Sequence, residues 1–206
     1  MISNVRWHSS DQDRLVWVGD SDSNQEYIVK SRYSVLNKED QMQVSEIFQL
    51  LWTLKIVPSA AVYAWRLLLD KLPTRLNLAK RGMQLTDLSC PLCQEYEESG
   101  QHLFTTCKVA QNVWDQCERW VGNVNVWHES ITIHFQSFGL VSWRQCVNLS
   151  SKGMWVAIVT ELWNHRNKVI FNIGLVDVIE IFTLAQLKGW CWLKNKFKRV
   201  AFSYSD

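Results

Sequence analysis

The sequence contains little of what long linkers, membrane spans or secretion signals require. Three Pro and eight Gly in 206 residues disfavour linkers, collagen-like repeats and a many-turned β-sandwich. No run of about 18 uncharged apolar residues occurs, which excludes a membrane-spanning helix. The N-terminal residues lack the apolar core of a secretory signal, so we expect a protein of the nucleus or cytoplasm that is not secreted. In such a reducing compartment the six Cys are thiols or metal ligands rather than disulfides.

Tryptophan and the placement of charge stand out among the residues that are present. Twelve Trp supply a large aromatic surface for a core or for stacking. The 22 basic and 20 acidic side chains leave a net charge of only +2, but they are unevenly placed. Two basic segments, residues 61–82 with five basic and one acidic side chain and residues 166–206 with seven and three, each carry +4 and flank an acidic middle. Partners must therefore be sought segment by segment.

Hydrophobic spacing predicts a mainly α protein with a small N-terminal β-hairpin, which together make a small α+β fold. The hairpin pairs Arg14–Val18 with Glu26–Val29 across a turn-rich connection. A short helix capped by Ser31 is expected to follow it. The further predicted helices are about 39–54, one capped by Ser59 that buries Val62, Trp65, Leu68 and Leu69, then 75–81 with Thr74 as cap and Gly82 as exit, one ending at Val121, 154 to about 168, and 176–197.

Four metal-ligand residues lie within 18 positions, in the pattern C-x2-C-x8-H-x4-C. They are Cys90, Cys93, His102 and Cys107. Two Cys at this spacing bind one ion from a tight turn, and a His and a Cys from a following helical turn complete a tetrahedron. Three thiolates and one imidazole suit a structural Zn²⁺, because protein fills every position. The other Cys, at 117, 146 and 191, lie far apart on apolar faces and are expected to be core thiols.

These observations divide the chain into three predicted segments. Residues 1–36 form the β-hairpin and a short helix, residues 37–122 form a helical zinc-binding domain with the Cys-Cys-His-Cys knuckle, and residues 123–206 form a helical region with a basic tail.

Motifs on both sides of the knuckle closely resemble the plant reverse-transcriptase zinc-binding domain, from the C-terminal end of LINE-type (non-LTR) retrotransposon polyproteins. The resemblance spans nearly the whole chain. It rests on Trp17, Y-I-V-K-S-R-Y at 27–33, L-W-T-L-K-I-V-P at 51–58, A-W-R-L-L at 64–68, K-L-P-T-R-L-N-L at 71–78, C-P-L-C at 90–93, H-L-F-T-T-C at 102–107, Val113-Trp114, and L-W-N-H-R-N-K-V-I-F at 162–171.

The resemblance implies a retroelement-derived accessory module that handles nucleic acid, RNA or single-stranded DNA, for a polymerase. The chain itself carries no paired-aspartate polymerase motif and no endonuclease domain.

Composition alone offers two candidate surfaces for nucleic acid, because cations beside aromatic rings are typical of single-strand binders. Their candidate contact residues are Arg75, Lys80 and Arg81 in the first basic segment and Lys194, Lys196, Lys198 and Arg199 in the second. The alternative is that these charges are solvated helix faces and the neighbouring Trp residues belong to the core. The knuckle itself, with Glu95, Glu97 and Glu98, is acidic and is not expected to hold phosphate.

Enzyme classes find no support in the sequence. A zinc deaminase needs an H-x-E pair, nuclease chemistry needs a carboxylate cluster for metal, and neither occurs. Nothing fixes a Cys–His pair such as Cys117 or Cys146 with His128 or His134. We therefore expect no enzyme. The competing class is a captured protein–protein interaction or regulatory module that no longer binds nucleic acid; an exposed apolar patch without a basic face would favour it.

Overall fold

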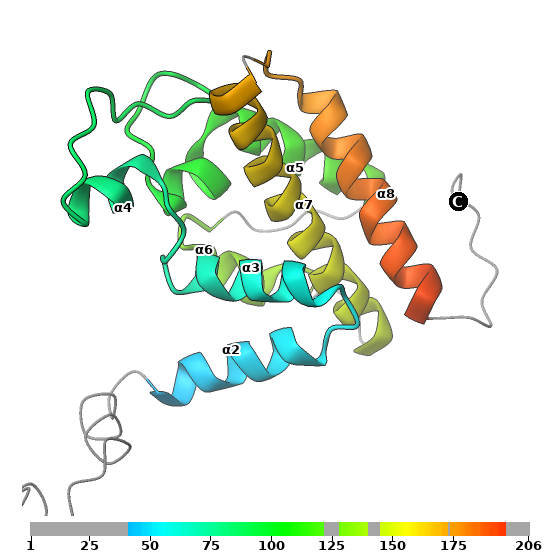
Figure 1. The fold of residues 1–206 in the computed structure, drawn as a ribbon. Coiled ribbons are helices and arrows are strands. Elements are labelled where there is room, and N and C mark those ends of the chain that lie inside the picture. Colours follow the sequence, from blue (N-terminus) through cyan, green and yellow to red (C-terminus); the bar gives the residue numbers. More distant parts are fainter. Residues whose placement is uncertain (1–40, 122–127, 140–144, 173, 197–206) are drawn as a thin grey trace, which may run out of the picture. The chain divides into compact units, whose positions relative to one another are not determined.

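Helices dominate the part of the chain that the structure, a computed structural model, describes: residues 41–121, 128–139, 145–172 and 174–196 (Figure 1). The mainly α prediction is confirmed there, whereas the predicted hairpin and the Ser31 helix lie outside the described residues. The elements are α2 Gln41–Thr53, α3 Pro58–Leu68, α4 Arg75–Lys80, the π-turn η1 His102–Thr106, α5 Lys108–Val121, α6 Ile131–Ser137, α7 Gln145–Asn172 and α8 Val178–Lys196. None of the described helices is long and apolar enough to cross a membrane.

The chain separates into two compact units, Met1–Ser45 and Glu46–Asp206. The metal-ligand residues and all of the packing described below belong to the second unit. Its core is one cluster of buried side chains that draws on α2, α3, α5, α6, α7, α8 and the cysteine-rich loop. The division of the chain at residue 122 remains a prediction.

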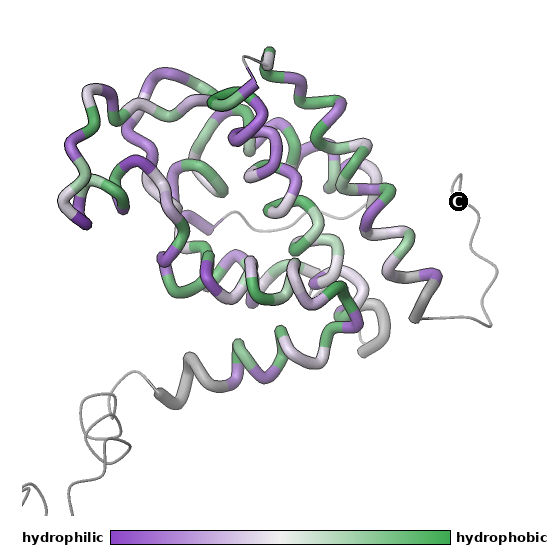
Figure 2. The backbone as a smooth tube through the Cα atoms, in the orientation of Figure 1, coloured by the Kyte–Doolittle hydropathy of each residue, from purple (hydrophilic) through white to green (hydrophobic). Residues whose placement is uncertain are grey.

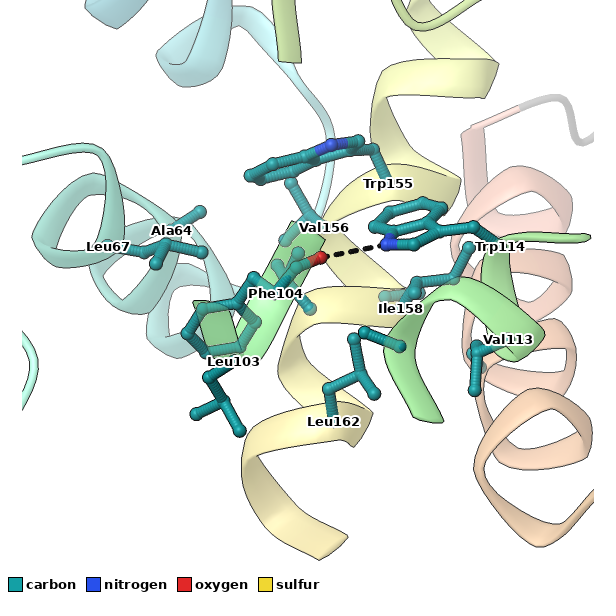
Figure 3. Close-up of a cluster of buried hydrophobic side chains, with 14 of the residues drawn as sticks. Ala64, Leu67, Leu103, Phe104, Val113, Trp114, Trp155, Val156, Ile158 and Leu162 are labelled. Carbon is teal, nitrogen blue, oxygen red and sulfur yellow. Dashed lines mark hydrogen bonds between the residues drawn. The ribbon is translucent and has the colours of Figure 1, made fainter. Parts of the chain in front are cut away.

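Helix α7 is the centre of the second unit. Residues 152–159 are all buried, so this part of the helix is covered on every side, as expected of a helix surrounded by others. Trp155 and Ile158 pack with Trp114 of α5 and Phe104 of η1 (Figure 3). The buried indole of Trp114 donates to the Phe104 carbonyl at 2.9 Å, so this ring is fixed to the π-turn by a hydrogen bond as well as by packing.

Helix α8 lies along α7 (Figure 1). A Cβ at Gly189 would come within 2.7 Å of the Met154 sulfur, so the absence of a side chain there permits the close approach. The nearly buried Glu161 of α7 pairs with Lys188 of α8. Lys188, one of the cations of the second basic segment, is therefore part of the helix–helix contact.

Helix α3 turns a different face to the core from the one predicted. Its buried residues are the small Ala60, Ala61 and Ala64 together with Leu67, whereas Val62 and Trp65 are exposed. The alanine face allows a short distance to α7, and the Tyr63 hydroxyl donates to the Val159 carbonyl there at 3.3 Å. The prediction of a buried stripe through Val62 and Trp65 is wrong. That prediction gave most weight to side-chain size, whereas the packed structure buries the small residues. Figure 2 shows hydrophobic and hydrophilic residues mixed along the described helices.

Local signals at helix ends were predicted with mixed success. Thr74 caps α4, as predicted, by accepting a hydrogen bond from the Asn77 amide at 3.3 Å. Gly82 follows α4 in the left-handed region at φ 89°, also as predicted. Helix α3, by contrast, begins at Pro58 with Val57 as N-cap, because proline suits the first helical position and displaces the predicted Ser59 cap.

A buried histidine links α6 to α7. His134 is 3% exposed, and its Nδ1 accepts a hydrogen bond from the Trp155 indole at 3.0 Å. Burial, with smaller contributions from the charges of His128 and Lys152, lowers the pKa of His134 from 6.5 to about 4. The folded protein therefore holds this imidazole neutral at pH values where the unfolded chain protonates it.

We expect this histidine to make the fold sensitive to acid. Below pH 6.5 His134 is protonated in the unfolded chain but stays neutral in the folded chain. The free energy of unfolding therefore falls as the pH drops toward 4. Between about pH 7 and pH 5 the wild type should lose about 2 kcal/mol more unfolding free energy than His134→Asn, which keeps an acceptor for Trp155. Urea unfolding of the zinc-loaded proteins at both pH values measures the difference. Both proteins share the same metal ligands, so equal losses would contradict this role for His134.

Candidate metal centre

A short antiparallel turn presents the first two cysteines. Ser89 and Glu97 form an isolated β-bridge, and the Cys90 amide donates to the Tyr96 carbonyl at 2.6 Å. Inside this turn the Gln94 amide donates to the Cys90 carbonyl at 2.8 Å, and Gln94 adopts a left-handed φ of 60°. The two-residue spacing of Cys90 and Cys93 thus closes into a tight loop with both sulfurs buried.

A π-turn presents the other two ligands. Ser99 Oγ accepts the His102 amide at 2.9 Å and starts the turn, and the Cys107 amide donates to the His102 carbonyl at 2.8 Å. In an α-helix, residues five apart point about 140° away from each other. The i→i+5 bond of η1 widens the turn and brings His102 and Cys107 to one side.

The four predicted ligand residues come together. One ligand atom from each of Cys90, Cys93, His102 and Cys107 lies within 4.8 Å of the others. The sulfurs of Cys90 and Cys107 are 4.0 Å apart, and Cys93 Sγ lies 3.2 Å from His102 Nε2. Ligand atoms around a tetrahedral Zn²⁺ with bonds of about 2.3 Å are separated by about 3.8 Å. The donor set and its spacing fit a structural zinc ion, as predicted.

The electrostatics of the cluster suit a cation as well. The hydrogen bond from the Cys90 thiol to Cys107, together with burial, raises the pKa of Cys90, because both favour the protonated form of this sulfur. The hydrogen bond from Cys90 lowers the pKa of Cys107; burial opposes this, and the backbone amides of Ala110 and Val109 at the start of α5 add to it. A divalent cation bound here would favour the deprotonated form of all three thiols.

Residues outside the ligand set orient the imidazole. Thr106 Oγ1 lies 3.3 Å from His102 Nδ1, which leaves Nε2 as the atom that faces the sulfurs. The ring of Tyr96 lies 5.5 Å from the His102 ring, while Tyr96 itself is exposed. Protein atoms thus fix the His102 ring from two sides.

A buried ion pair ties the metal loop to α7. Glu98 is fully buried, and its carboxylate receives two hydrogen bonds from Arg166, Nε to Oε1 at 2.6 Å and Nη2 to Oε2 at 2.7 Å. Oε2 also accepts the Arg75 amide at 2.8 Å, at the start of α4. The Arg166 guanidinium lies over the Trp163 ring at 4.6 Å. Glu98 therefore joins the metal loop, α4 and α7. From the sequence, Glu98 was expected only to add negative charge to the loop, and the R-N motif at 166–167 was the available signal for its partner.

The residues predicted to contact nucleic acid differ in their surroundings: some are paired within the fold, some are exposed, and some lie outside the described residues. Arg75 is used internally, since its guanidinium pairs with Asp87 and donates to the Ser89 carbonyl at 2.8 Å. Lys80 and Arg81 are exposed at the end of α4. Lys194 is exposed and its ammonium lies 4.8 Å from the Trp190 ring centroid. The Lys196 side chain and both Lys198 and Arg199 lie outside the described residues.

The remaining cysteines do not join the cluster. Cys117 is buried, as predicted, and burial raises the pKa of its thiol to about 12. Cys191 is exposed on α8, so the prediction of a core thiol is wrong there; the residue lies on the side of α8 that faces away from the core. The side chain of Cys146 lies outside the described residues.

Residues 27–114 match a family model described as zinc-binding in reverse transcriptase. This part of the chain is therefore similar to the zinc-binding domain of reverse transcriptases. The four ligands lie inside the matched range, and Glu98 does too, while Arg166 lies beyond it. No curated protein and no solved structure matches the chain significantly.

Loss of one ligand should release the metal and loosen the loop. Because the binding energy of a structural zinc site is folding energy, Cys90→Ser and His102→Ala should each lose the bound zinc and lower the melting temperature. Cys117→Ser is the matched control, since it also changes a buried thiol but lies outside the cluster, and it should keep one zinc per chain. Metal analysis with calorimetry reads both properties. A Cys90→Ser protein with unchanged melting and no metal would contradict the structural role.

The buried pair should contribute far more to stability than an exposed pair in the same loop. Arg166→Met leaves the Glu98 carboxylate buried without its partner, which should cost about 3–5 kcal/mol. Lys108→Met breaks the exposed pair with Glu95 and should cost less than about 1 kcal/mol. Chemical unfolding of the zinc-loaded variants compares the two costs. Equal costs would show that Glu98 and Arg166 do not hold the loop.

Proposed function

We propose that this chain is a non-catalytic, zinc-stabilised module that binds RNA or single-stranded DNA. One observation carries the proposal. The five exposed cations between residues 55 and 81 form no ion pair within the described part of the chain; they are Lys55, Arg66, Lys71, Lys80 and Arg81. The same stretch holds one carboxylate, Asp70, which accepts a hydrogen bond from Asn77 at 2.9 Å. These cations are available to phosphates.

Four cations outside this stretch are already used in ion pairs within the described chain. Arg166 pairs with Glu98, Lys108 with Glu95, Lys168 with Glu180 and Lys188 with Glu161. The contrast supports the first basic segment as the binding surface, with Arg75 acting as a structural residue rather than a phosphate contact.

The negative charge of the metal loop opposes nucleic-acid binding less than its sequence suggests. Of its three carboxylates, Glu98 is buried against Arg166 and Glu95 pairs with Lys108. Of the three, only Glu97 is exposed without an ion pair among the described residues. The loop's effective charge toward a polyanion is therefore smaller than its sequence indicates.

The metal would hold the loop in place rather than take part in a reaction. A Zn²⁺ held by all four side chains has no open site for a reacting water, so it supplies stability alone. The loop it closes carries Glu98, which holds the first turn of α4 through the Arg75 and Leu76 amides. Helix α4 in turn carries Lys80 toward solvent. The zinc site thereby orders part of the cationic surface.

Removing unpaired cations should weaken binding more than removing paired ones. Lys71→Gln with Lys80→Gln should lower affinity for a labelled single strand and reduce the slope of log affinity against log salt by about 1.4. Lys108→Gln with Lys168→Gln removes the same charge from paired positions and should leave the slope nearly unchanged. Fluorescence anisotropy at three salt concentrations measures both. Absence of binding by the folded, zinc-loaded wild type at low salt would reject the proposal.

A second candidate function, binding of a protein partner, has its own observation. Apolar side chains gather where α7 passes into α8, with Phe171, Leu175 and Ile179 all exposed, Leu175 at 89%. Exposed apolar patches mark interaction sites. Under the first proposal, Leu175→Ser with Ile179→Ser leaves nucleic-acid affinity unchanged, so the same titration separates the two surfaces.

A further inference from the structure

Two exposed tryptophans lie on adjoining faces of α2 and α3. Phe48 and Trp52 are one turn apart on α2, and the Phe48 ring meets the Trp65 ring of α3 at 6.5 Å and 68°. Val62 lies one turn before Trp65. We call these four side chains, Phe48, Trp52, Val62 and Trp65, the tryptophan stripe. Phe48 packs against the core, whereas Trp52 is 53% exposed and Trp65 36%.

Contacts with the core do not account for the two tryptophans of the stripe, Trp52 and Trp65. Helix α3 already meets the core through its alanines and Leu67, and α2 does so through Ile47 and Leu51. Neither indole N–H of the stripe donates a hydrogen bond within the described residues. Two large aromatic side chains therefore remain in solvent on a surface whose buried side is complete.

Charge around the stripe selects its partner. Residues 46–69 carry two cations, Lys55 and Arg66, and one carboxylate, Glu46. The carboxylate lies on α2. Lys55 follows α2 directly, and Arg66 shares the exposed face of α3 with Val62 and Trp65. Neither cation has an ion pair in the described chain. Aromatic faces flanked by available cations complement bases and phosphates.

We infer that the tryptophan stripe stacks unpaired bases of a single-stranded nucleic acid while Lys55 and Arg66 contact its phosphates. This rests on the proposed function and adds to it a preference: bases in a duplex already stack on each other and cannot use the indole faces. The stripe therefore favours single strands over duplexes of the same sequence.

The first test uses wild-type, zinc-loaded protein and three probes of about 12 nucleotides: a single strand, its duplex, and an abasic strand with the same phosphates. The single strand should bind at least about fivefold more tightly than the abasic strand, because stacking contributes about 1 kcal/mol or more per base. Equal affinity for all three overturns the inference and leaves the proposed function standing. No binding to any probe overturns both.

The second test uses side-chain replacement. Trp52→Ala and Trp65→Ala should each weaken single-strand binding about fivefold or more with no change in salt slope or in abasic-strand affinity. Trp52→Phe and Trp65→Phe keep an aromatic face and should retain most of the affinity. Trp120→Ala is the control, since Trp120 is an exposed tryptophan on α5 that packs against Phe182. Zinc content and thermal melting verify folding of each variant.

Two outcomes of the second test would overturn the inference. One is unchanged single-strand affinity in both alanine variants. The other is dimerisation of the wild type, measured by sedimentation, that Trp52→Ala abolishes, because the stripe then belongs to a second copy of the chain. If the alanine variants fail to fold, the Phe variants and the abasic comparison on wild type decide.

Discussion

The pairing of Glu98 with Arg166 is the constraint on which the second unit depends. A fully buried carboxylate is tolerated only when its oxygens are satisfied, and here Arg166 and the Arg75 amide supply three hydrogen bonds. Glu98 sits between the second and third metal ligands, so the metal loop cannot move without breaking this pair. Zinc closes the loop on one side and Arg166 holds it on the other. Stability of the metal site and of the contact with α7 are therefore coupled.

Features set by local chemistry could be predicted from the sequence. The metal ligands follow from their spacing, since Cys90 and Cys93 need only one tight turn and no distant segment. The i→i+5 separation of His102 and Cys107 even contained the signal for a π-turn, because an α-helix would point them apart. Helix α4 follows from the Thr74 cap and the Gly82 exit. Each of these depends on a few neighbouring residues.

Features set by distant packing could not be predicted. Whether Glu98 is surface charge or buried anchor depends on Arg166, 68 positions away. The face that α3 buries depends on how closely α7 approaches, which favours alanine over Trp65. The short helix α6 lay in a stretch whose spacing gave no clear period, and its contact with α7 through His134 is again tertiary. Composition names candidate residues, but only packing assigns them to core or surface.

Tertiary packing also decides which charges of this chain are available to a partner. A net charge of +2 indicates little affinity for a polyanion, yet the described cations are of two kinds. Those of the second basic segment within the described residues are partly consumed by helix–helix contacts, as Lys188 and Lys168 are. The exposed cations between residues 55 and 81, Lys55, Arg66, Lys71, Lys80 and Arg81, form no ion pair within the described residues, and Lys55 and Arg66 are close in sequence to the exposed Trp52 and Trp65. On this surface the aromatic faces and the cations remain in water, because the fold neither buries the two indole rings nor supplies ion pairs for the cations within the described residues. That combination fits a flexible strand, which supplies phosphates and bases together, better than a purely apolar protein face.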